Sequence, residues 1–298
     1  MPEPAKPIVS ALVVNQNTKD QLLSCLRAFF ASADVPVEAI VVDNASTDGS
    51  AAAVTAVFPN VTVLVQQKDL GYGRAANLGL ERCQGRFVLL LGTDVMLDPQ
   101  CVGRLADFLL TRQDAGAVGP RLVLPDGGLD PEARRAFPTP SAMLYRTLGL
   151  AKLFPKSPRF GRAGMSHIPE GEVHEIDAGT GSCLMLRTAA LDRGGFFDPR
   201  YLTAGEDLDL CYRLKQGGWK VFYLPTARAS RVAQPLTQQQ QRQKSLQRSR
   251  AMWTYHYKHH SEGVSAFSNG LVWAQIWGRY VAELARDAIG RPNRATGH

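Results

Sequence analysis

Polar and glycine-rich segments follow four apolar stretches of the chain, and their residues can bind a ligand through hydrogen bonds, carboxylate ligation or close backbone approach. These segments are Asn15–Asn17, Asp43–Ser50, Asp69–Gly73 and Gly92–Asp94. Turn formation alone explains any one of them, because Asn, Asp and Gly favour turns. In a parallel sheet, however, ligands bind outside the carboxyl ends of the strands. Four such segments in succession therefore predict a binding site at one edge of a sheet.

The elements that must position these residues alternate regularly. Unbroken apolar runs predict buried strands at Ile8–Val14, Ala39–Val42, Val61–Val65 and Phe87–Leu91. Helical spacing and helix-stop signals predict helices at Thr18–Ser32, Ser46–Val57, Arg74–Arg82 and Asp98–Leu110. Four strand–helix repeats predict an α/β fold with a mostly parallel central sheet flanked by helices.

The second half of the chain is less regular. Gly119–Phe137 is rich in Gly, Pro and Asp and predicts loop with short strands, and Pro138–Val173 predicts a mobile or acceptor-side segment. A strand pair is expected within Ile176–Arg187, a helix at Asp207–Gln216 and a strand at Trp219–Leu224.

The composition is that of an ordinary globular protein. The chain has 298 residues, 45% apolar and 20% charged, which excludes wholesale disorder, collagen and coiled coil. The net charge of +7 is concentrated near the C-terminus, where 11 Lys and Arg stand against 3 Asp and Glu from Arg228 onward. A basic tail suits anionic lipid, nucleic acid or an acidic partner. The rest of the chain is near neutral, so nucleic-acid binding is not expected.

The cysteines and the hydropathy of the chain indicate the cellular compartment in which the protein is expected. Five cysteines occur without a CxxC pair, and the odd number argues against a disulfide framework. No apolar run is long enough to predict a membrane-spanning helix, and the first residues lack the pattern of a signal peptide. The sequence therefore predicts a cytoplasmic protein, either free or at the cytoplasmic face of a membrane.

The segment Val264–Ala288 has the spacing of an amphipathic helix. Its apolar residues at helical spacing are Trp273, Ile276, Trp277, Tyr280 and Leu284. This helix either docks on its own domain or on a partner, such as a second copy in a homodimer, or lies in a membrane interface. Upstream, His256, His259 and His260 form a cluster that has no cysteine nearby in the sequence. We expect them on a solvated or membrane-facing surface rather than around zinc.

Blocks of residues in a fixed order relate the chain to a known family. They are Val41–Ser50, Leu70–Asn77, Leu89–Asp94, Ala117–Pro120, Gly179–Arg187, Gly194–Asp198 and Gly205–Arg213. From Ile8 to about Val232 the chain resembles a family 2 glycosyltransferase of the GT-A fold, and within that family the bacterial rhamnosyltransferase-like branch. The resemblance implies a GT-A domain at 1–232, with a nucleotide-binding half at about 8–120 and an acceptor half at about 121–232. A basic helical extension follows at 233–298.

The resemblance also implies an activity. Such an enzyme moves a sugar, for which the branch favours rhamnose, from a nucleotide diphosphate sugar (dTDP-, UDP- or GDP-linked). The acceptor would be a hydroxyl of a glycan or lipid-linked glycan, and the anomeric carbon would be inverted. The product would enter a cell-surface polysaccharide or glycoconjugate. Peripheral membrane contact through the C-terminal helix would suit a lipid-linked acceptor.

Roles in nucleotide binding follow from the matched positions. In this family the acid after the second strand, here Asp43, hydrogen-bonds the nucleotide base. Asn15 and Asn17 stand where the family lines the nucleotide pocket. The Gly71–Gly73 loop would let the backbone approach the nucleotide, and Arg74 would meet phosphate. The other nucleotide-binding candidates are Asn44, Thr93 and Asp94.

Asp94 matches the last acid of the family's Asp-x-Asp-type motif, which implies a metal ligand. A divalent cation, Mg²⁺ or Mn²⁺, neutralises the diphosphate as it leaves. Gly92 stands at the first position of the motif, so the metal would depend on Asp94, the diphosphate and water. The family often has a metal-binding histidine after the last strand, and none occurs near Arg228 and Arg231. We therefore expect one of these arginines to contact the diphosphate directly.

Glu206 and Asp207 match the family's catalytic pair. A hydroxyl is a poor nucleophile until its proton leaves, so sugar transfer needs a base. The resemblance implies that Asp207 is this base and that Glu206 supports it or substitutes for it, with Asp177 and Gly181 in the acceptor and donor pocket. The structural alternative for the acidic pair is a charged first helical turn, favoured by the helix dipole.

Two other functions compete with the transferase. Gly92 and the missing histidine suit a catalytically weakened binding or scaffold subunit that keeps the GT-A fold. The pattern Gly71-x-Gly73-x-x-Ala76 also fits the fingerprint of a dinucleotide-binding oxidoreductase. That fingerprint should follow the first strand of the sheet, and here it follows the third, so the oxidoreductase is the remote alternative.

Overall fold

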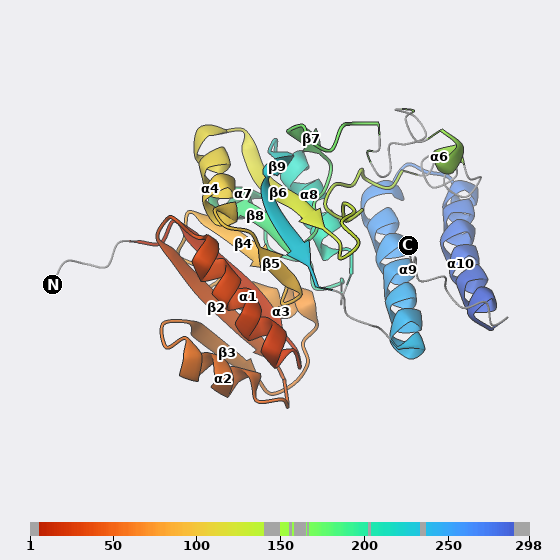
Figure 1. Cartoon of the computed structure of the whole chain (residues 1–298). Helices are drawn as coiled ribbons and strands as arrows, with labels where there is room; N and C mark the ends of the chain where they lie inside the picture. The colour runs from red at the N-terminus through yellow and green to blue at the C-terminus, as the bar shows by residue number, and fades with distance from the viewer. Residues whose placement is uncertain are drawn as a thin grey trace.

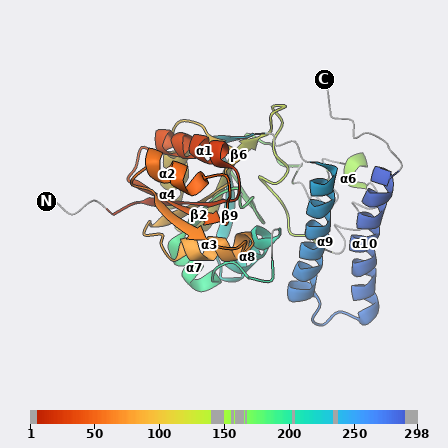
Figure 2. The same ribbon diagram turned by 90° about the horizontal axis from the view of Figure 1, so that it is seen from below.

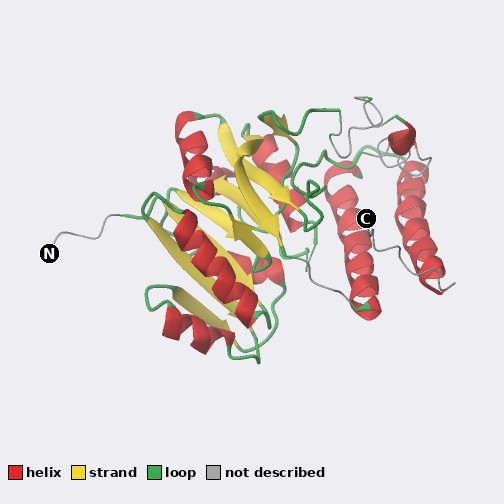
Figure 3. Ribbon diagram, viewed as in Figure 1, coloured by secondary structure: helices red, strands yellow, loops and turns green. Residues whose placement is uncertain are grey.

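The computed structural model describes residues 6–139, 150–154, 157, 165, 167–201, 204–232 and 237–288. Much of the predicted acceptor-side segment Pro138–Val173 lies outside these residues. A nine-stranded sheet carries helices on both faces, and a two-helix hairpin stands beside it (Figure 1). The strands form one continuous twisted sheet (Figure 3).

The first half of the chain alternates strands and helices, as the sequence predicts. Its elements are β1 (Val9–Asn15), α1 (Lys19–Ser32), β2 (Val37–Asn44), α2 (Ser50–Val57), β3 (Thr62–Gln66), α3 (Tyr72–Leu80) and β4 (Phe87–Leu91). The four strands pair in parallel in the order β3-β2-β1-β4. The carboxyl ends of β1, β2 and β4 therefore meet at one edge of the sheet.

The second half completes the sheet with mixed pairing. Its elements are β5 (Val95–Leu97), α4 (Cys101–Thr111), β6 (Ala115–Val123), α6 (Leu150–Leu153), β7 (His174–Ile176), β8 (Cys183–Arg187), α7 (Thr188–Gly194), α8 (Glu206–Gln216) and β9 (Lys220–Arg231). The order continues β4-β8-β6-β9-β5; only the β6–β9 pair is parallel, and β7 joins β9. The α/β class with a helix-flanked sheet is confirmed, with its parallel strands concentrated in the first half. Of the strand pair expected within Ile176–Arg187, β8 lies inside that range, β7 reaches it only at Ile176, and the two strands do not pair with each other.

Both faces of the sheet are covered by helices. Figure 2 shows α1, α2 and α4 on one side and α3, α7 and α8 on the other. Leu22, Phe29 and Leu105 belong to the core on the first side, and Leu80 and Leu210 to the core on the second. Burial on both faces is why the strands read as unbroken apolar runs rather than alternating ones. The five cysteines are free thiols, and all except the half-buried Cys83 are buried.

The C-terminal hairpin consists of α9 (Gln238–His260) and α10 (Ala266–Ala288), which pack against each other. A capping box between Thr237 and Gln240 begins α9. In the part of the chain that the structure describes, no helix combines the length and apolarity needed to cross a membrane.

The histidines of α9 correct one sequence expectation. His256 is buried and its Nε2 lies 2.8 Å from Asn269 Oδ1 of α10. His259 Nε2 lies 2.7 Å from Asp209 Oδ1 of α8, and its side chain is only 9% exposed. The expectation of a solvated or membrane-facing surface is wrong for these two, because each has a polar partner on a neighbouring helix that the sequence could not reveal.

Candidate active site

The ends of β1 and β2 bring Asn15 and Asp43 together. The two residues are opposite each other in the parallel register, and both are buried. Asn15 Nδ2 donates to Asp43 Oδ1 at 3.0 Å and to Ser46 Oγ at 3.1 Å. Thr18 Oγ1 donates to Asn15 Oδ1 at 2.7 Å and lies 3.0 Å from Thr93 Oγ1, next to the end of β4. Three strand ends therefore share one hydrogen-bonded network.

Asn17 and Asn44 lie on opposite sides of this network and differ in exposure. Asn17 is exposed in a left-handed conformation (φ 54°), and its Oδ1 accepts the Thr47 N–H at 2.8 Å. Asn44 is buried; its Nδ2 donates to Asp69 Oδ1 at 2.7 Å, and its Oδ1 accepts the Leu70 N–H at 2.9 Å. The Asn44 side chain therefore fixes the loop that begins at Asp69.

This loop leads into α3 through two glycines. Gly71 has a φ of +75°, a conformation that residues with a side chain rarely adopt. A Cβ on Gly73 would lie 3.4 Å from the Tyr201 carbonyl oxygen, so the backbone here packs closely against another loop. Arg74 is exposed, and among the described residues its guanidinium has no partner. The cation next to the glycine loop is available to a ligand.

Asp94 stands beside Arg231 at the meeting of β5 and β9. Arg231 Nε lies 3.9 Å from Asp94 Oδ2 and 3.0 Å from Asp130 Oδ2, and Glu132 Oε2 is 4.0 Å from Arg231 Nη1. Asp130 is 4% exposed and Asp94 25%. Arg231 Nε and Nη2 are buried without a hydrogen bond of acceptable geometry among the described residues. Arg231 is ion-paired with Asp130, and its buried Nη2 is the donor that remains for an anionic ligand.

Arg228 lies elsewhere. It stands opposite Asp98 rather than Asp94, because the Asp98 N–H donates to the Arg228 carbonyl oxygen at 3.1 Å. Its exposed side chain lines a cavity of about 450 Å³ that it shares with Arg104 and Arg121. Of the two arginines that the sequence offers for the diphosphate, the structure brings Arg231 to Asp94 and leaves Arg228 apart.

The glycine at position 92 has a local structural reason. A Cβ at this position would lie 2.6 Å from Asp94 Oδ1 and 3.3 Å from Ser182 Cβ. Asp94 is therefore the one carboxylate of the motif. In the described ranges there is no group of three or more His, Cys, Asp or Glu residues that could hold a metal. A single carboxylate fits Mg²⁺ or Mn²⁺ when the diphosphate and water supply the other oxygens.

Asp207 lies in the first turn of α8 and accepts hydrogen bonds from three donors. Arg135 Nη2 lies 2.6 Å and the Gly181 N–H 2.9 Å from Asp207 Oδ2, and the Leu208 N–H donates to Asp207 Oδ1 at 2.7 Å. The carboxylate is 14% exposed. Arg135 was not among the residues singled out from the sequence, where it is one of several charges in a loop. An isolated bridge between Arg135 and Ala178 brings it to the site.

Glu206, the residue before Asp207 in the chain, has a different environment. Its Oε2 is buried with no hydrogen-bond partner among the described residues. Burial first, and then the negative charge of Asp207, raise the pKa of Glu206 to about 8. Glu206 therefore keeps its proton at neutral pH, and such a strongly shifted carboxyl group is typical of active sites.

The turn Gly181–Ser182 joins the two halves of the site. The Gly181 N–H donates to Asp207, and the Ser182 carbonyl oxygen accepts the Gly92 N–H at 2.8 Å. Tyr72 Oη also donates to the Gly181 carbonyl oxygen, at 3.3 Å. The segment that carries Asp94 and the helix that carries Asp207 thus contact adjacent residues of one turn, Ser182 and Gly181 respectively.

Asp177 has structural partners. Its Oδ2 accepts the Phe137 N–H at 2.9 Å, and its Oδ1 lies 3.1 Å from Lys215 Nζ of α8. Asp130, which was not singled out from the sequence, is closer to the site through Arg231. Its only sequence signal is its place in a Gly-, Pro- and Asp-rich loop.

Comparison with known proteins identifies the family of the chain. The model of glycosyl transferase family 2 matches residues 10–166. N-acetylglucosaminyl-diphospho-decaprenol L-rhamnosyltransferase of Mycobacterium tuberculosis is 30% identical over 236 residues, which cover 74% of this chain and 74% of that protein.

Two solved structures share the GT-A fold. Staphylococcus aureus TarS 1-349 superposes with a TM-score of 0.58 at 15% identity, over 96% of this chain and 75% of that one. The mannosyltransferase PcManGT from Pyrobaculum calidifontis, in complex with GDP-Man and Mn²⁺, gives a TM-score of 0.57 at 16% identity, over 96% and 76%. On the family match and the extent of the mycobacterial similarity, the chain belongs to glycosyltransferase family 2 and is a rhamnosyltransferase-like member of it.

Proposed function

We propose that the protein transfers a sugar from a nucleoside diphosphate sugar to a hydroxyl of a lipid-linked glycan, with inversion, in the synthesis of a cell-surface polysaccharide. The observation that carries this proposal is the Gly181–Ser182 turn, which contacts Gly92 on one side and Asp207 on the other. A segment suited to the leaving diphosphate and a carboxylate suited to the acceptor hydroxyl therefore adjoin one turn. Inverting transfer requires these two functions close to a single anomeric carbon.

The nucleotide is proposed to bind at the ends of β1 and β2. The buried Asn15–Asp43 pair is pre-organised by its hydrogen bond, and Asp43 would accept a base N–H. The Gly71–Gly73 loop and exposed Arg74 would face the phosphates. In the proposed division of the chain, these residues form the nucleotide-binding half of a domain at 1–232.

Two positive groups are proposed to stabilise the leaving diphosphate. Arg231 supplies guanidinium N–H donors without a hydrogen bond of acceptable geometry, and Asp94 would hold Mg²⁺ or Mn²⁺. Such a cation, when bound, neutralises the charge that develops on the diphosphate. The solved relative with GDP-Man and Mn²⁺ supports this class of cofactor.

Asp207 is proposed as the base that takes the proton of the acceptor hydroxyl. Arg135 and the Gly181 N–H fix the direction of its carboxylate. Ionised Glu206 would place a second negative charge beside the proton that leaves the acceptor hydroxyl, and this charge favours the transfer. Turnover should therefore rise as the pH passes through about 8, the pKa of Glu206.

Rhamnose and a polyprenyl diphosphate-linked acceptor are the proposed substrates. The name of the mycobacterial relative gives L-rhamnose and N-acetylglucosaminyl-diphospho-decaprenol, and that protein is 30% identical to this one over 74% of this chain. The nucleoside of the donor can be identified by nucleotide binding.

Calorimetric titration with dTDP, UDP and GDP, each with and without Mn²⁺ or Mg²⁺, tests the donor site. We expect one of the three to bind. Asp94→Asn should abolish the gain from metal, and Arg231→Gln should weaken binding about tenfold by removing charged hydrogen bonds. Asp98→Asn and Arg228→Gln are matched controls, because both residues line the separate cavity.

Two results would contradict this scheme. If Arg228→Gln weakens binding as much as Arg231→Gln, the diphosphate does not lie beside Asp94. If nucleotide binds but intact donor and acceptor give no product at any pH, the weakened scaffold is the better description of the chain.

A further inference from the structure

The outer face of α10, which is turned away from α9, is apolar over its whole length. Its residues are Phe267, Leu271, Ala274, Gly278, Val281 and Ala285, and all are exposed. They recur every three or four positions, so they form a single stripe. Phe267 is 76% exposed, Val281 61% and Leu271 53%. Trp273, 51% exposed, flanks this stripe.

Arg279 and Glu283 of α10 lie off this stripe. Glu283 accepts a hydrogen bond from Ser245 of α9 and pairs with Arg279 at 3.0 Å. Val272 and Ile276 are buried on the side that packs on α9. The helix therefore makes its polar contacts within the hairpin and presents its apolar side chains outward. A helix whose outer face meets only water has the opposite arrangement.

We propose that this outer face docks on the surface of an anionic lipid bilayer. Residues 237–298 hold nine Lys and Arg against three Asp and Glu, which attracts anionic headgroups. Three of the four tryptophans of the chain, Trp253, Trp273 and Trp277, lie in the hairpin, and tryptophan favours the membrane–water interface. A second copy of the chain would bring another hairpin region with the same net positive charge against this one, so lipid is the better complement.

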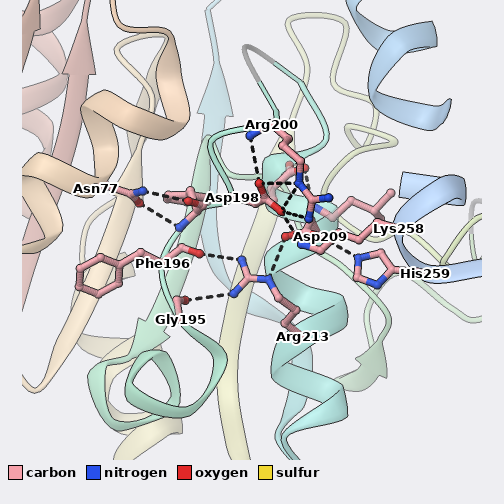
Figure 4. Close-up of polar contacts among 12 residues, drawn as sticks. Asn77, Gly195, Phe196, Asp198, Arg200, Asp209, Arg213, Lys258 and His259 are labelled. Carbon is pink, nitrogen blue, oxygen red and sulfur yellow. Dashed lines mark hydrogen bonds and ion pairs between the residues drawn. The ribbon is translucent and has the colours of Figure 1, made fainter. Parts of the chain in front are cut away.

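A buried ion-pair cluster clamps the hairpin to the catalytic helix (Figure 4). Lys258 Nζ of α9 lies 2.6 Å from Asp209 Oδ1 of α8 and 2.7 Å from Asp198 Oδ2. His259 and Arg213 also contact the Asp209 carboxylate, whose side chain is fully buried. Burial alone would raise the pKa of Asp209, but Lys258 and the other basic partners lower it below its ordinary value.

A close backbone approach reinforces this clamp. Gly205, which precedes the catalytic pair, has a φ of +83°, and a Cβ placed on it would lie 2.9 Å from Ala251 Cβ of α9. Helix α8 and the hairpin are therefore held in one arrangement. Docking of α10 on lipid would fix the distance and orientation of Asp207 relative to the membrane surface.

Co-sedimentation of the full chain with vesicles tests the proposal without donor, acceptor or metal, so the result is independent of the proposed transfer reaction. We expect binding to vesicles of equal parts phosphatidylglycerol and phosphatidylcholine, and weaker binding to pure phosphatidylcholine. Val281→Glu should weaken binding about tenfold or more, because a charge would enter the apolar contact. Val65→Glu is the matched control, since Val65 on β3 is equally exposed at 61%.

A second measurement avoids substitution altogether. Tryptophan emission of the unmodified protein should shift to shorter wavelength with anionic vesicles, because Trp273 would enter the interface. Absence of binding, or equal binding by the Val281→Glu and unmodified proteins, would overturn the proposal. So would a dimer in solution that Val281→Glu dissociates while vesicles bind neither protein, which would assign the stripe to a second copy.

Discussion

Glu206 and Asp207 are neighbouring acidic residues whose surroundings in the fold differ strongly. Asp207 receives three hydrogen bonds, whereas Glu206 Oε2 is buried without one among the described residues. A buried carboxyl without a partner avoids ionisation, and one with charged donors favours it. The sequence predicts the pair as a unit, and only the surroundings in the fold distinguish the two roles.

This difference gives a stability prediction. The unfolded chain ionises Glu206 near 4.5 while the folded chain does so near 8, so the wild type loses stability as pH rises through this window. Glu206→Gln removes the ionisation and should be more stable by about 2 kcal/mol at pH 9, or about 4 °C in Tm. At pH 4 the two proteins should melt alike.

The control for this prediction is Glu262→Gln, at an exposed glutamate between α9 and α10. Thermal melts of the three proteins across the pH range provide the comparison. A constant difference between wild type and Glu206→Gln at every pH would mean that burial of Glu206 does not govern its ionisation.

At the scale of elements, two helical glycines should respond oppositely to alanine. In α3, a Cβ on Gly79 would lie 2.2 Å from Leu12 Cδ1 and 3.0 Å from Val42 Cγ2. Gly79→Ala should destabilise by about 2 kcal/mol through overpacking. In α10, Gly278 has nothing within 4 Å of its Cβ position, so Gly278→Ala should stabilise by up to about 1 kcal/mol through helix propensity.

Urea unfolding of both variants checks this pair. If the two variants change the free energy of unfolding equally, α3 can move away from β1 and β2 at little cost. The close packing between α3 and these strands would then not be what stabilises this side of the sheet.

The sequence predicts the first half of the sheet because each strand there is buried on both faces and each crossover is local. Pairing in the second half joins distant segments, for example β8 with β4 and β6, and no local pattern encodes it. The predicted strand Trp219–Leu224 extends to Arg231 in β9 because β6 and β5 pair with its far end. Arg135 and Asp130 entered the site through such non-local contacts, whereas Asn15, Asp43 and Asp94 follow local strand ends.

Across the whole molecule, Asp209 is one of the residues that join the sheet domain to the hairpin. Asp209→Asn would remove the buried counter-charge of Arg213 and leave Lys258 with Asp198 alone, and it should destabilise by about 3 kcal/mol. Asp114→Asn is the matched control: it also loses two basic partners, but at 42% exposure the loss should stay below about 1 kcal/mol. Chemical denaturation of both variants measures the contrast.

The same denaturation curves also show whether the hairpin unfolds together with the sheet. If α9 and α10 unfold with the sheet, both variants should keep a single transition. A separate early transition in Asp209→Asn alone would show that the hairpin depends on this cluster for its place. Equal free energies of unfolding in the two variants would contradict a clamp at Asp209.

The free thiols of the chain simplify its site-specific labelling. Burial raises the pKa of Cys25, Cys83, Cys101 and Cys211 to about 12, and that of Cys183 is raised as well. Alkylating reagents attack the thiolate, so the native cysteines are poor targets at neutral pH. An Ala274→Cys substitution on the exposed stripe of α10 therefore offers a uniquely reactive handle for a fluorophore or spin label, without first removing any natural cysteine.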